Sequence, residues 1–326
     1  MHFYLIGIDY KSAPIGIRDE IYRGRKAVSD FWKSHSPYGA AILITCNRLE
    51  IYGVSEYADD AFGLIHSFAE SFPDFARHAY IKHGQREISR HTLRLAAGLE
   101  SQIRGEEQIL MQLEKWMRDI LAHPIRDLLD EAISLSRNIR AASKLDEDND
   151  SIATLILSDI KRRLKSKERY EVIVVGTGKI AELFAEHSYP EVHLNFAAHK
   201  NYDKAKDLAE YSNGEALYLK DLPSVIAGAD ALICATSSPH YVIKRDHFNK
   251  WPIEREYPLY IYDLAIPRGV DPQIAAVGGL YLQNLDDLDH IFYRHNESRR
   301  QRAESASDLI EDALKISEEV THGKDH

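Results

Sequence analysis

The sequence predicts an α/β protein with a small N-terminal α+β domain, a doubly wound parallel α/β domain and a C-terminal helix. Strand, helix and two further strand patterns within residues 3–54 predict the first domain. The apolar run Val172–Val175, typical of a parallel strand covered on both faces, opens the second. A run without proline or glycine from residue 285 to Thr321 predicts the helix. We expect domains at 1–150, 151–283 and 284–326.

Composition, charge and cysteine content limit the classes of protein to which this sequence can belong. A chain of 326 residues with 44% hydrophobic and 28% charged residues is typical of a soluble globular protein of about two domains. No apolar run approaches the ~20 residues of a membrane span, and the N-terminus has a strand pattern rather than that of a signal peptide. Two cysteines give no disulfide framework and suit the cytoplasm. A net charge of −10 argues against non-specific binding of nucleic acid but leaves a local binding patch open.

In the first domain, a strand over residues 3–8 and a helix over roughly 18–34 precede the strand Ala40–Ile44, which delivers Cys46 to a turn. A second strand follows over residues 50–54. A thiol becomes a nucleophile as thiolate, and Arg48 supplies a nearby cation that could also bind a carboxylate. A lone cysteine is more often a small buried hydrophobe, so this pattern alone favours packing over catalysis.

Residues 87–122 predict a helical run in which Ile88, His91, Leu95 and Leu99 share one face. A histidine on such a face is more often a packed residue than a catalyst. A second amphipathic helix is expected over Ile125–Ala142. Ser151 is a plausible N-cap for a connecting helix over 151–167, and the domain boundary is placed there.

The second domain has the pattern of a dinucleotide-binding, Rossmann-type fold. A GxGxxA turn follows the Val172–Val175 strand, opens a helix and is followed by another strand at about 192–197. An acidic residue at the end of that second strand would favour NAD, but the chain has His199 and Lys200, which favours NADP(H). The predicted cofactor-binding residues are Gly176, Thr177, Gly178, Lys179, Ile180, Ala181, His199, Lys200 and Thr236.

Two further strands are expected at 231–236 and 259–265. Thr236 ends the first of them at the carboxyl edge of the sheet, where dinucleotides bind. Cys234 lies inside that strand, which favours a packing role. Asp263 could be structural or could line the nicotinamide side, and the sequence leaves both interpretations open.

The stretch Thr45-Cys46-Asn47-Arg48-Leu49-Glu50-Ile51-Tyr52 resembles the active-site signature of glutamyl-tRNA reductases, the first committed enzymes of the C5 route to tetrapyrroles. Further blocks resemble this family in the same order, at residues 91–101, 105–110, 137–140 and 266–272. The chain departs from the family pattern at a few positions. These are Tyr10 in place of a histidine, Glu107 in place of a proline, Met111 in place of a glycine and Lys200 in place of an arginine.

The resemblance implies a reaction. Cys46 would attack the glutamyl ester to form an enzyme thioester, and NADPH would reduce this thioester to glutamate-1-semialdehyde. His91 would face the thiol and assist proton transfer. The implied substrate-binding residues are Thr45, Asn47, Arg48, Ser101, Glu106, Gln108 and Arg140. The implied partners are glutamyl-tRNA and an aminomutase that takes the product. No metal-ligand spacing is present, so no catalytic metal is expected.

Two alternatives compete with this interpretation. One is a shikimate-dehydrogenase-like oxidoreductase without a covalent intermediate, and the other is a non-catalytic tRNA-binding relative. Cys46, His91 and the glycine-rich turn argue against the second. The family continues into a helical dimerisation domain that this sequence lacks, and the apolar stripe Leu309–Val320 is too short for a strong coiled coil. We therefore expect a monomer or a weak dimer.

Overall fold

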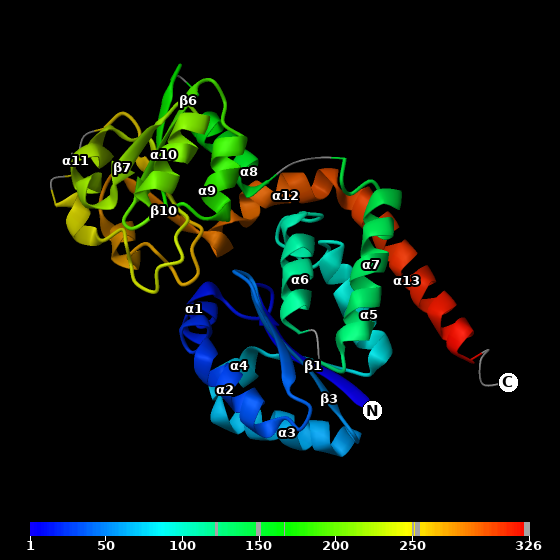
Figure 1. Ribbon diagram of the computed structural model, residues 1–326. Coiled ribbons are helices and arrows are strands. Elements are labelled where there is room, and N and C mark those ends of the chain that lie inside the picture. The colour runs from blue at the N-terminus through cyan, green and yellow to red at the C-terminus, as the bar shows by residue number, and fades with distance from the viewer. Residues whose placement is uncertain (121–122, 148–150, 166, 250, 252–254, 323–326) are drawn as a thin grey trace. The chain divides into compact units, whose positions relative to one another are not determined.

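The computed structural model describes residues 1–120, 123–147, 151–165, 167–249, 251 and 255–322. The chain forms two compact units (Figure 1). The first comprises Met1–Asn149 and Tyr293–His326, and the second comprises Asp150–Phe292. The expected segment 284–326 is therefore split, because most of it folds together with the N-terminal residues.

The first unit is built on a four-stranded antiparallel sheet of order β2-β3-β1-β4, covered on both faces. Tyr4, Ile6 and Ile51 point to one face and pack with Phe68 of α3, whereas Leu5 and Tyr52 point to the other and pack with residues of α5, α6 and α7. Period-2 alternation along each strand places these side chains on opposite faces. The elements are β1 (His2–Asp9), α1 (Ile15–Arg23), α2 (Arg25–His35), β2 (Ala40–Ile44), β3 (Arg48–Ser55), α3 (Ala58–Ser71), α4 (Pro73–His78), β4 (Tyr80–His83), α5 (Gln85–Ala96), α6 (Gln108–Asp119) and α7 (Arg126–Ala142).

The expected helical run 87–122 is wrong as one element. It consists of α5 and α6, separated by a loop over residues 97–107, and residues 121–122 lie outside the described residues. Gly98 and Gly105 in this loop have positive φ angles of 76° and 75°, a conformation that ends helices. The apolar spacing continues through the loop because Leu99 and Ile103 are also buried. Periodicity therefore could not reveal the break.

The C-terminal helices are α12 (Asp289–Ser298), which begins in the second unit, and α13 (Arg300–His322). From Tyr293 onward they belong to the first unit. Buried residues of α13 pack with Leu93 and Ala97 in one apolar cluster, and Arg90 of α5 forms an ion pair with Glu311 at 2.7 Å. The apolar side chains that α13 buries in this way are Ala303, Ala306, Ile310 and Leu314.

The second unit contains the predicted parallel sheet, with six strands in the order β10-β9-β8-β5-β6-β7. Ser151 caps α8 as predicted, in a capping box with Thr154. β7 and β10 were not predicted, and β8 and β9 end at Cys234 and Asp263, earlier than expected. The elements are α8 (Ile152–Arg163), β5 (Tyr170–Val175), α9 (Lys179–Glu186), β6 (Val192–Ala198), α10 (Tyr202–Tyr211), β7 (Glu215–Tyr218), α11 (Leu222–Val225), β8 (Ala231–Cys234), β9 (Leu259–Asp263), β10 (Leu280–Asn284) and the 3₁₀ turns η1 (Leu219–Asp221), η2 (Ile226–Gly228), η3 (Arg245–Phe248), η4 (Pro272–Ala276) and η5 (Leu285–Leu288).

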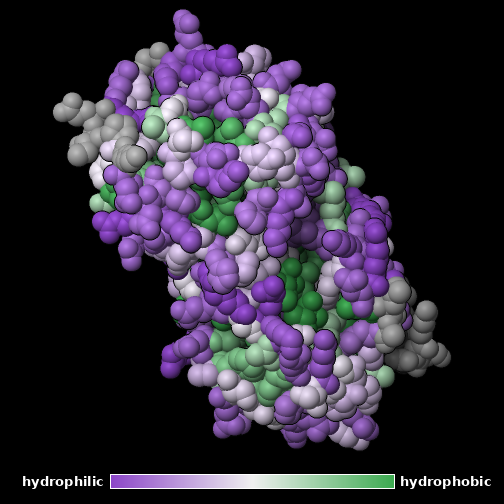
Figure 2. Space-filling model, turned by 60° about the vertical axis from the view of Figure 1, so that its left-hand side comes forward, coloured by the Kyte–Doolittle hydropathy of each residue, from purple (hydrophilic) through white to green (hydrophobic). Residues whose placement is uncertain are grey.

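Polar and charged side chains cover most of the face seen in Figure 2, with apolar residues visible in patches between them. Across the residues described, the helices are either too short or too polar to cross a bilayer.

Candidate active site

Cys46 lies at the tip of the turn that joins β2 to β3. The Thr45 hydroxyl accepts a hydrogen bond from the Asn47 amide at 3.2 Å, and the Thr45 amide donates to the Arg48 carbonyl at 3.0 Å. Arg18 of α1 holds this turn from outside, because its Nη1 donates to Asn47 Oδ1 at 3.1 Å and to the Cys46 carbonyl at 3.4 Å. The Cys46 side chain is left exposed to solvent, where a substrate can reach it.

Three charged groups surround the thiol. Desolvation by the surrounding protein raises the pKa of Cys46 to about 11 and the Glu106 carboxylate adds to the rise, whereas Arg18 and Arg48 lower it. Arg18 and Arg48 therefore act against desolvation and Glu106 in setting the fraction of Cys46 that is present as thiolate. Burial also raises the pKa of Glu106, against a hydrogen bond from Ser101 and the charges of Arg48 and Arg140.

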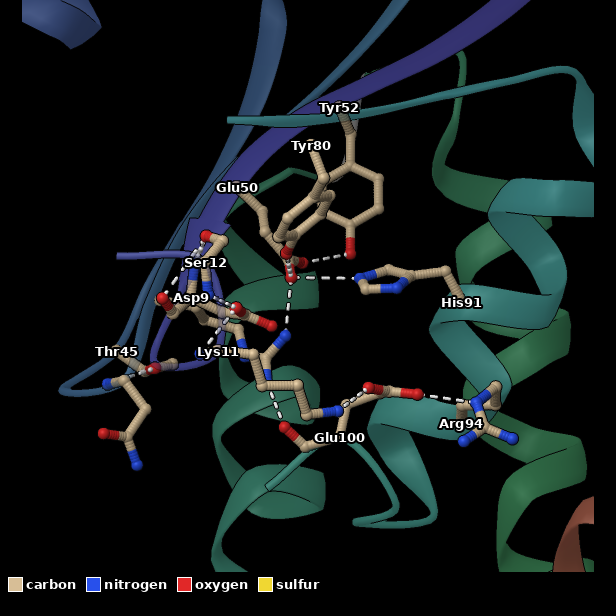
Figure 3. A network of polar contacts seen from close by, with 12 residues as sticks. Asp9, Lys11, Ser12, Thr45, Glu50, Tyr52, Tyr80, His91, Arg94 and Glu100 are labelled. Carbon is tan, nitrogen blue, oxygen red and sulfur yellow. Dashed lines mark hydrogen bonds and ion pairs between the residues drawn. The ribbon is translucent and has the colours of Figure 1, made fainter. Parts of the chain in front are cut away.

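A buried carboxylate, Glu50, organises the neighbouring polar cluster (Figure 3). Its Oε1 accepts hydrogen bonds from Arg48 Nη1 at 2.7 Å, Tyr80 at 2.5 Å and His91 Nε2 at 3.0 Å, and its Oε2 accepts one from Tyr52 at 2.6 Å. Burial alone would raise the pKa of Glu50, but the charges of His91 and Arg48 and these hydrogen bonds hold it far below its ordinary value.

The local sequence explains how this cluster forms. Arg48, Glu50 and Tyr52 alternate along β3 and so share one face of the sheet. Gly7 of β1 lies opposite both Glu50 and Tyr80. A Cβ at Gly7 would lie 2.8 Å from Glu50 Cγ and 3.0 Å from the Tyr80 ring, so glycine lets the two side chains meet. Glu50 was not among the predicted site residues, although the Arg-x-Glu-x-Tyr alternation could have identified it.

A second carboxylate, Glu100, follows α5 and joins the cluster through its backbone, whose carbonyl accepts a hydrogen bond from Arg48 Nη2 at 2.5 Å. Its side chain pairs with Lys11 at 2.5 Å and Arg94 at 2.6 Å. Burial opposes ionisation, but these two cations lower the pKa of Glu100 to about 2. A pocket of about 240 Å³ adjoins the cluster. Its lining residues are Asp9, Tyr80, Lys82, Glu87, Arg90, His91, Arg94 and Glu100.

The structure gives His91 and Arg48 partners within the protein, and their expected roles toward the thiol and the substrate stay predictions. A carboxylate only accepts hydrogen bonds, so His91 Nε2 must carry the proton that it shares with Glu50. The expectation that this histidine faces the thiol stays a prediction. Arg48 is 3% exposed and binds Glu50 and the Glu100 carbonyl, so its charge is already paired within the protein.

Arg140 acts within the protein as well. Its guanidinium donates to the carbonyls of Ala97, Gly105 and Glu106 at 3.1, 3.0 and 3.3 Å and pairs with Asp146. These contacts make Arg140 a positioning residue for the 97–107 loop, and the substrate contact that the resemblance implies stays a prediction. The loop also carries Glu106, whose charge acts on Cys46, and Ser101, which is hydrogen-bonded to Glu106.

Gln108, the first residue of α6, differs from these paired groups. Its amide nitrogen is buried and has no hydrogen-bond partner in the part of the chain that the structure describes. A buried donor without a partner costs about 1–3 kcal/mol, which a ligand with an acceptor would recover. Gln108 thus offers a ligand a buried donor that has no partner among the described residues.

The glycine-rich turn of the second unit joins β5 to α9. Gly176 has a φ of 123°, and a Cβ there would lie 2.3 Å from the Ala235 carbonyl oxygen, so this position requires glycine. Gly178 is the N-cap of α9 and has open space where a Cβ would lie. The turn therefore fits a pyrophosphate, whose charge the helix N-terminus favours. Thr177, Lys179, Ile180 and Ala181 complete this turn and the first turn of α9.

The other predicted cofactor residues follow neighbouring strands of the same sheet. His199 and Lys200 are exposed directly after β6, and Thr236 follows β8 next to Gly176. Asp263 is buried at the end of β9, and its carboxylate accepts hydrogen bonds from the amides of Ala265, Gly269 and Val270. These bonds give Asp263 a structural role in the loop after β9.

The described residues contain no group of three or more His, Cys, Asp or Glu side chains that could hold a metal ion. The candidate sites for catalysis and ligand binding are the Cys46 turn with its polar neighbours and the glycine-rich turn.

Comparison with known proteins adds two family matches. Residues 6–145 match the model described as "Glutamyl-tRNAGlu reductase, N-terminal domain", and residues 156–291 match "Shikimate / quinate 5-dehydrogenase". The glutamyl-tRNA reductase of a Thermus thermophilus strain is 32% identical over 95% of this chain and 78% of its own length. That of Methanococcoides burtonii is 32% identical over 88% and 68%. The solved glutamyl-tRNA reductase from Methanopyrus kandleri is 28% identical, with a TM-score of 0.49, over 98% of this chain and 80% of that one.

Proposed function

Because the chain belongs to the glutamyl-tRNA reductase family, whose reaction is the reduction of glutamyl-tRNA in tetrapyrrole biosynthesis, we propose that it carries out this reduction through a thioester on Cys46. The observation that carries the proposal is the exposed Cys46 thiol on a turn held by Arg18, beside Glu106 and Arg48. These residues supply a nucleophile, fixed geometry and opposing charges at one place.

In the first step, the Cys46 sulfur bonds to the carbonyl carbon of the glutamyl ester, and the bond from that carbon to the tRNA ribose oxygen breaks. The thiol proton leaves the sulfur, and the departing ribose oxygen takes up a proton. Reduction of the carbonyl carbon then breaks its bond to sulfur, which regenerates the thiolate and yields the aldehyde. The thioester accepts a hydride more readily than the starting ester, which is the chemical reason for the covalent step.

The charges around Cys46 give the substrate a part in its own activation. The α-ammonium group of a glutamyl ester would pair with the Glu106 carboxylate, which Ser101 holds in place. Neutralising Glu106 removes one of the causes that raise the pKa of Cys46, while Arg18 and Arg48 continue to lower it. The unpaired Gln108 amide nitrogen would donate to an oxygen of the glutamyl group. Thr45 and Asn47 shape the turn beneath the thiol.

The residues present fit a nicotinamide dinucleotide. Gly176 and Gly178 would accommodate the pyrophosphate, and Lys200 would pair with a 2′-phosphate, which favours NADPH. NADPH supplies the hydride when bound. His91 would move a proton through its imidazole while Glu50 keeps the ring oriented, since Nε2 is held by that carboxylate.

The proposal is tested by replacing Cys46 with serine, whose hydroxyl is hardly ionised near neutral pH. We expect NADPH oxidation that depends on glutamyl-tRNA to fall on the order of 10³-fold or more. Cys234→Ala is the matched control, because this cysteine is buried in β8. A serine variant that keeps more than a few per cent of the activity would favour the alternative suggested by residues 156–291, hydride transfer without a covalent intermediate.

A monomer is the assembly that the packing of α13 supports. Its buried apolar residues already pack within the first unit, and Ile316 is its large apolar side chain that stays exposed among those described. We expect sedimentation at micromolar concentration to give a species near the chain mass of 37.2 kDa. A tight dimer independent of concentration would contradict this.

The aldehyde product is reactive, which favours its direct transfer to the aminomutase partner expected from the resemblance.

A further inference from the structure

The loop over residues 97–107, which we call the Glu106 loop, is anchored from two sides. Arg140 of α7 holds one side through the three carbonyls described above, and its side chain is 2% exposed. The loop also closes on itself, because the Gly105 amide donates to the Gly98 carbonyl at 3.0 Å. Both glycines have positive φ angles, so these positions favour glycine while adding backbone freedom that the anchors must restrict.

The second anchor comes from the C-terminal end of α12. Asn296 Nδ2 donates to the Gln102 carbonyl at 2.8 Å, and Asn296 Oδ1 accepts from the Arg104 amide at 2.9 Å. One side-chain amide thus binds an acceptor and a donor two residues apart, as a neighbouring strand would. Arg299, 1% exposed, donates to the Arg104 carbonyl at 3.0 Å, and a Cβ on Gly105 would lie 2.9 Å from its Nη1.

We propose that Asn296 is a positioning residue for the reaction, because its two hydrogen bonds fix the loop that carries Glu106, one of the charged groups around Cys46. This inference rests on the proposed function for its effect on catalysis. The two hydrogen bonds from Asn296 to the Glu106 loop, which we call the clamp, rest only on the contacts just given. Asn296 takes no part in the apolar packing of the next helix, α13, which is held by Ala303, Ala306, Ile310 and Leu314.

The clamp can be tested without substrate, through the thiol that it influences. The charged groups that face Cys46 are Arg18 of α1, Arg48 of β3 and Glu106 of the loop. Iodoacetamide reacts with the thiolate, and Cys234 is buried, so the rate of alkylation against pH reports on Cys46. Glu106→Gln removes the negative charge and should move the midpoint of this profile to lower pH. Asn296→Ala should move it in the same direction, because a released loop carries Glu106 away from the thiol.

The same variant should lower kcat/KM for glutamyl-tRNA between about 10- and 100-fold, the range expected when a site residue is displaced by about 1 Å. Glu297→Gln is the matched control, because this residue is exposed on the same helix, and it should change neither measurement. A folded Asn296→Ala protein with an unchanged alkylation profile and unchanged kcat/KM would overturn the proposal. If the wild-type chain fails to reduce glutamyl-tRNA, the proposed function fails, while the alkylation series still decides whether the clamp exists.

Folding of each variant is followed by thermal unfolding. If Asn296→Ala does not fold, Asn296→Ser replaces it, because a hydroxyl can still bond to one of the two backbone groups. A folded serine variant should show the same shift in the alkylation profile, and an unchanged profile would contradict the clamp. If neither variant folds, Asn296 is required for the stability of the unit, and the positioning role is refuted.

Discussion

The polar cluster around Glu50 and the glycine-rich turn differ in whether the protein itself supplies the partners of their polar groups. Glu50 is 0% exposed and is bound by Arg48, Tyr52, Tyr80 and His91, which come from three different elements. The glycine-rich turn is one contiguous segment, with open space beside Gly178. The cluster is organised by the protein itself before any ligand binds, whereas the turn provides room and a helix N-terminus for a ligand. Substitutions in the cluster should therefore affect stability, and those near the turn should affect ligand preference.

The largest effect is expected from Glu50→Gln. The change leaves the buried Arg48 guanidinium without its countercharge, and breaking a buried pair in this way costs about 3–5 kcal/mol. We expect this loss in the free energy of unfolding measured with urea, together with a fall in reductase activity. Glu87→Gln is the control, since Glu87 lines the pocket that adjoins the cluster but is half-exposed, so this change should alter stability by less than about 0.5 kcal/mol. A Glu50→Gln protein as stable as the wild type would show that the cluster is not preorganised.

A smaller effect, on binding alone, is expected from Lys200→Asp. Reversing an exposed charge beside a 2′-phosphate should shift the preference for NADPH over NADH by about tenfold or more and leave stability unchanged. Fluorescence titration with both cofactors measures this ratio, with Lys165→Asp as an exposed control outside the turn. If the wild-type protein binds both cofactors equally, the assignment of Lys200 is wrong.

The smallest effect concerns the pH dependence of stability at Glu100. The Glu100 carboxyl has a pKa of about 2 in the folded protein and about 4.3 in the unfolded chain. Its contribution to the free energy of unfolding is therefore fully present above the unfolded pKa and is lost as the pH falls through the folded pKa. The ion pairs are partly exposed, so we expect Glu100→Gln to cost about 1 kcal/mol near pH 6. The difference from wild type should shrink as the pH falls toward about 3. A difference that is constant with pH would assign the effect to packing instead of charge.

The same contrast explains what could be predicted from the sequence. The parallel sheet and its turn follow from local signals, namely an apolar strand, two glycines and a helix in order. The Cys46 turn was also placed correctly between two strands. The partner of His91 could not be predicted, because Glu50 lies 41 residues away in sequence and reaches His91 only through the folding of β3 against α5.

The Glu106 loop was missed for a related reason. Buried Leu99 and Ile103 extend the helical spacing through residues that are not helical. The contacts that hold the loop come from α7 and from Asn296, which lies 192 residues from Arg104 in sequence. Long-range contacts of this kind leave no periodic signal in a single sequence.

The central claim is that Cys46 carries the glutamyl group during the reaction. The most direct test is to mix the protein with glutamyl-tRNA in the absence of NADPH, quench with acid and determine the mass of the peptide that contains Cys46. We predict a gain of one glutamyl group on this peptide, removed by hydroxylamine and absent from Cys46→Ser. An unmodified Cys46 peptide from a preparation that reduces glutamyl-tRNA when NADPH is added would contradict the covalent mechanism.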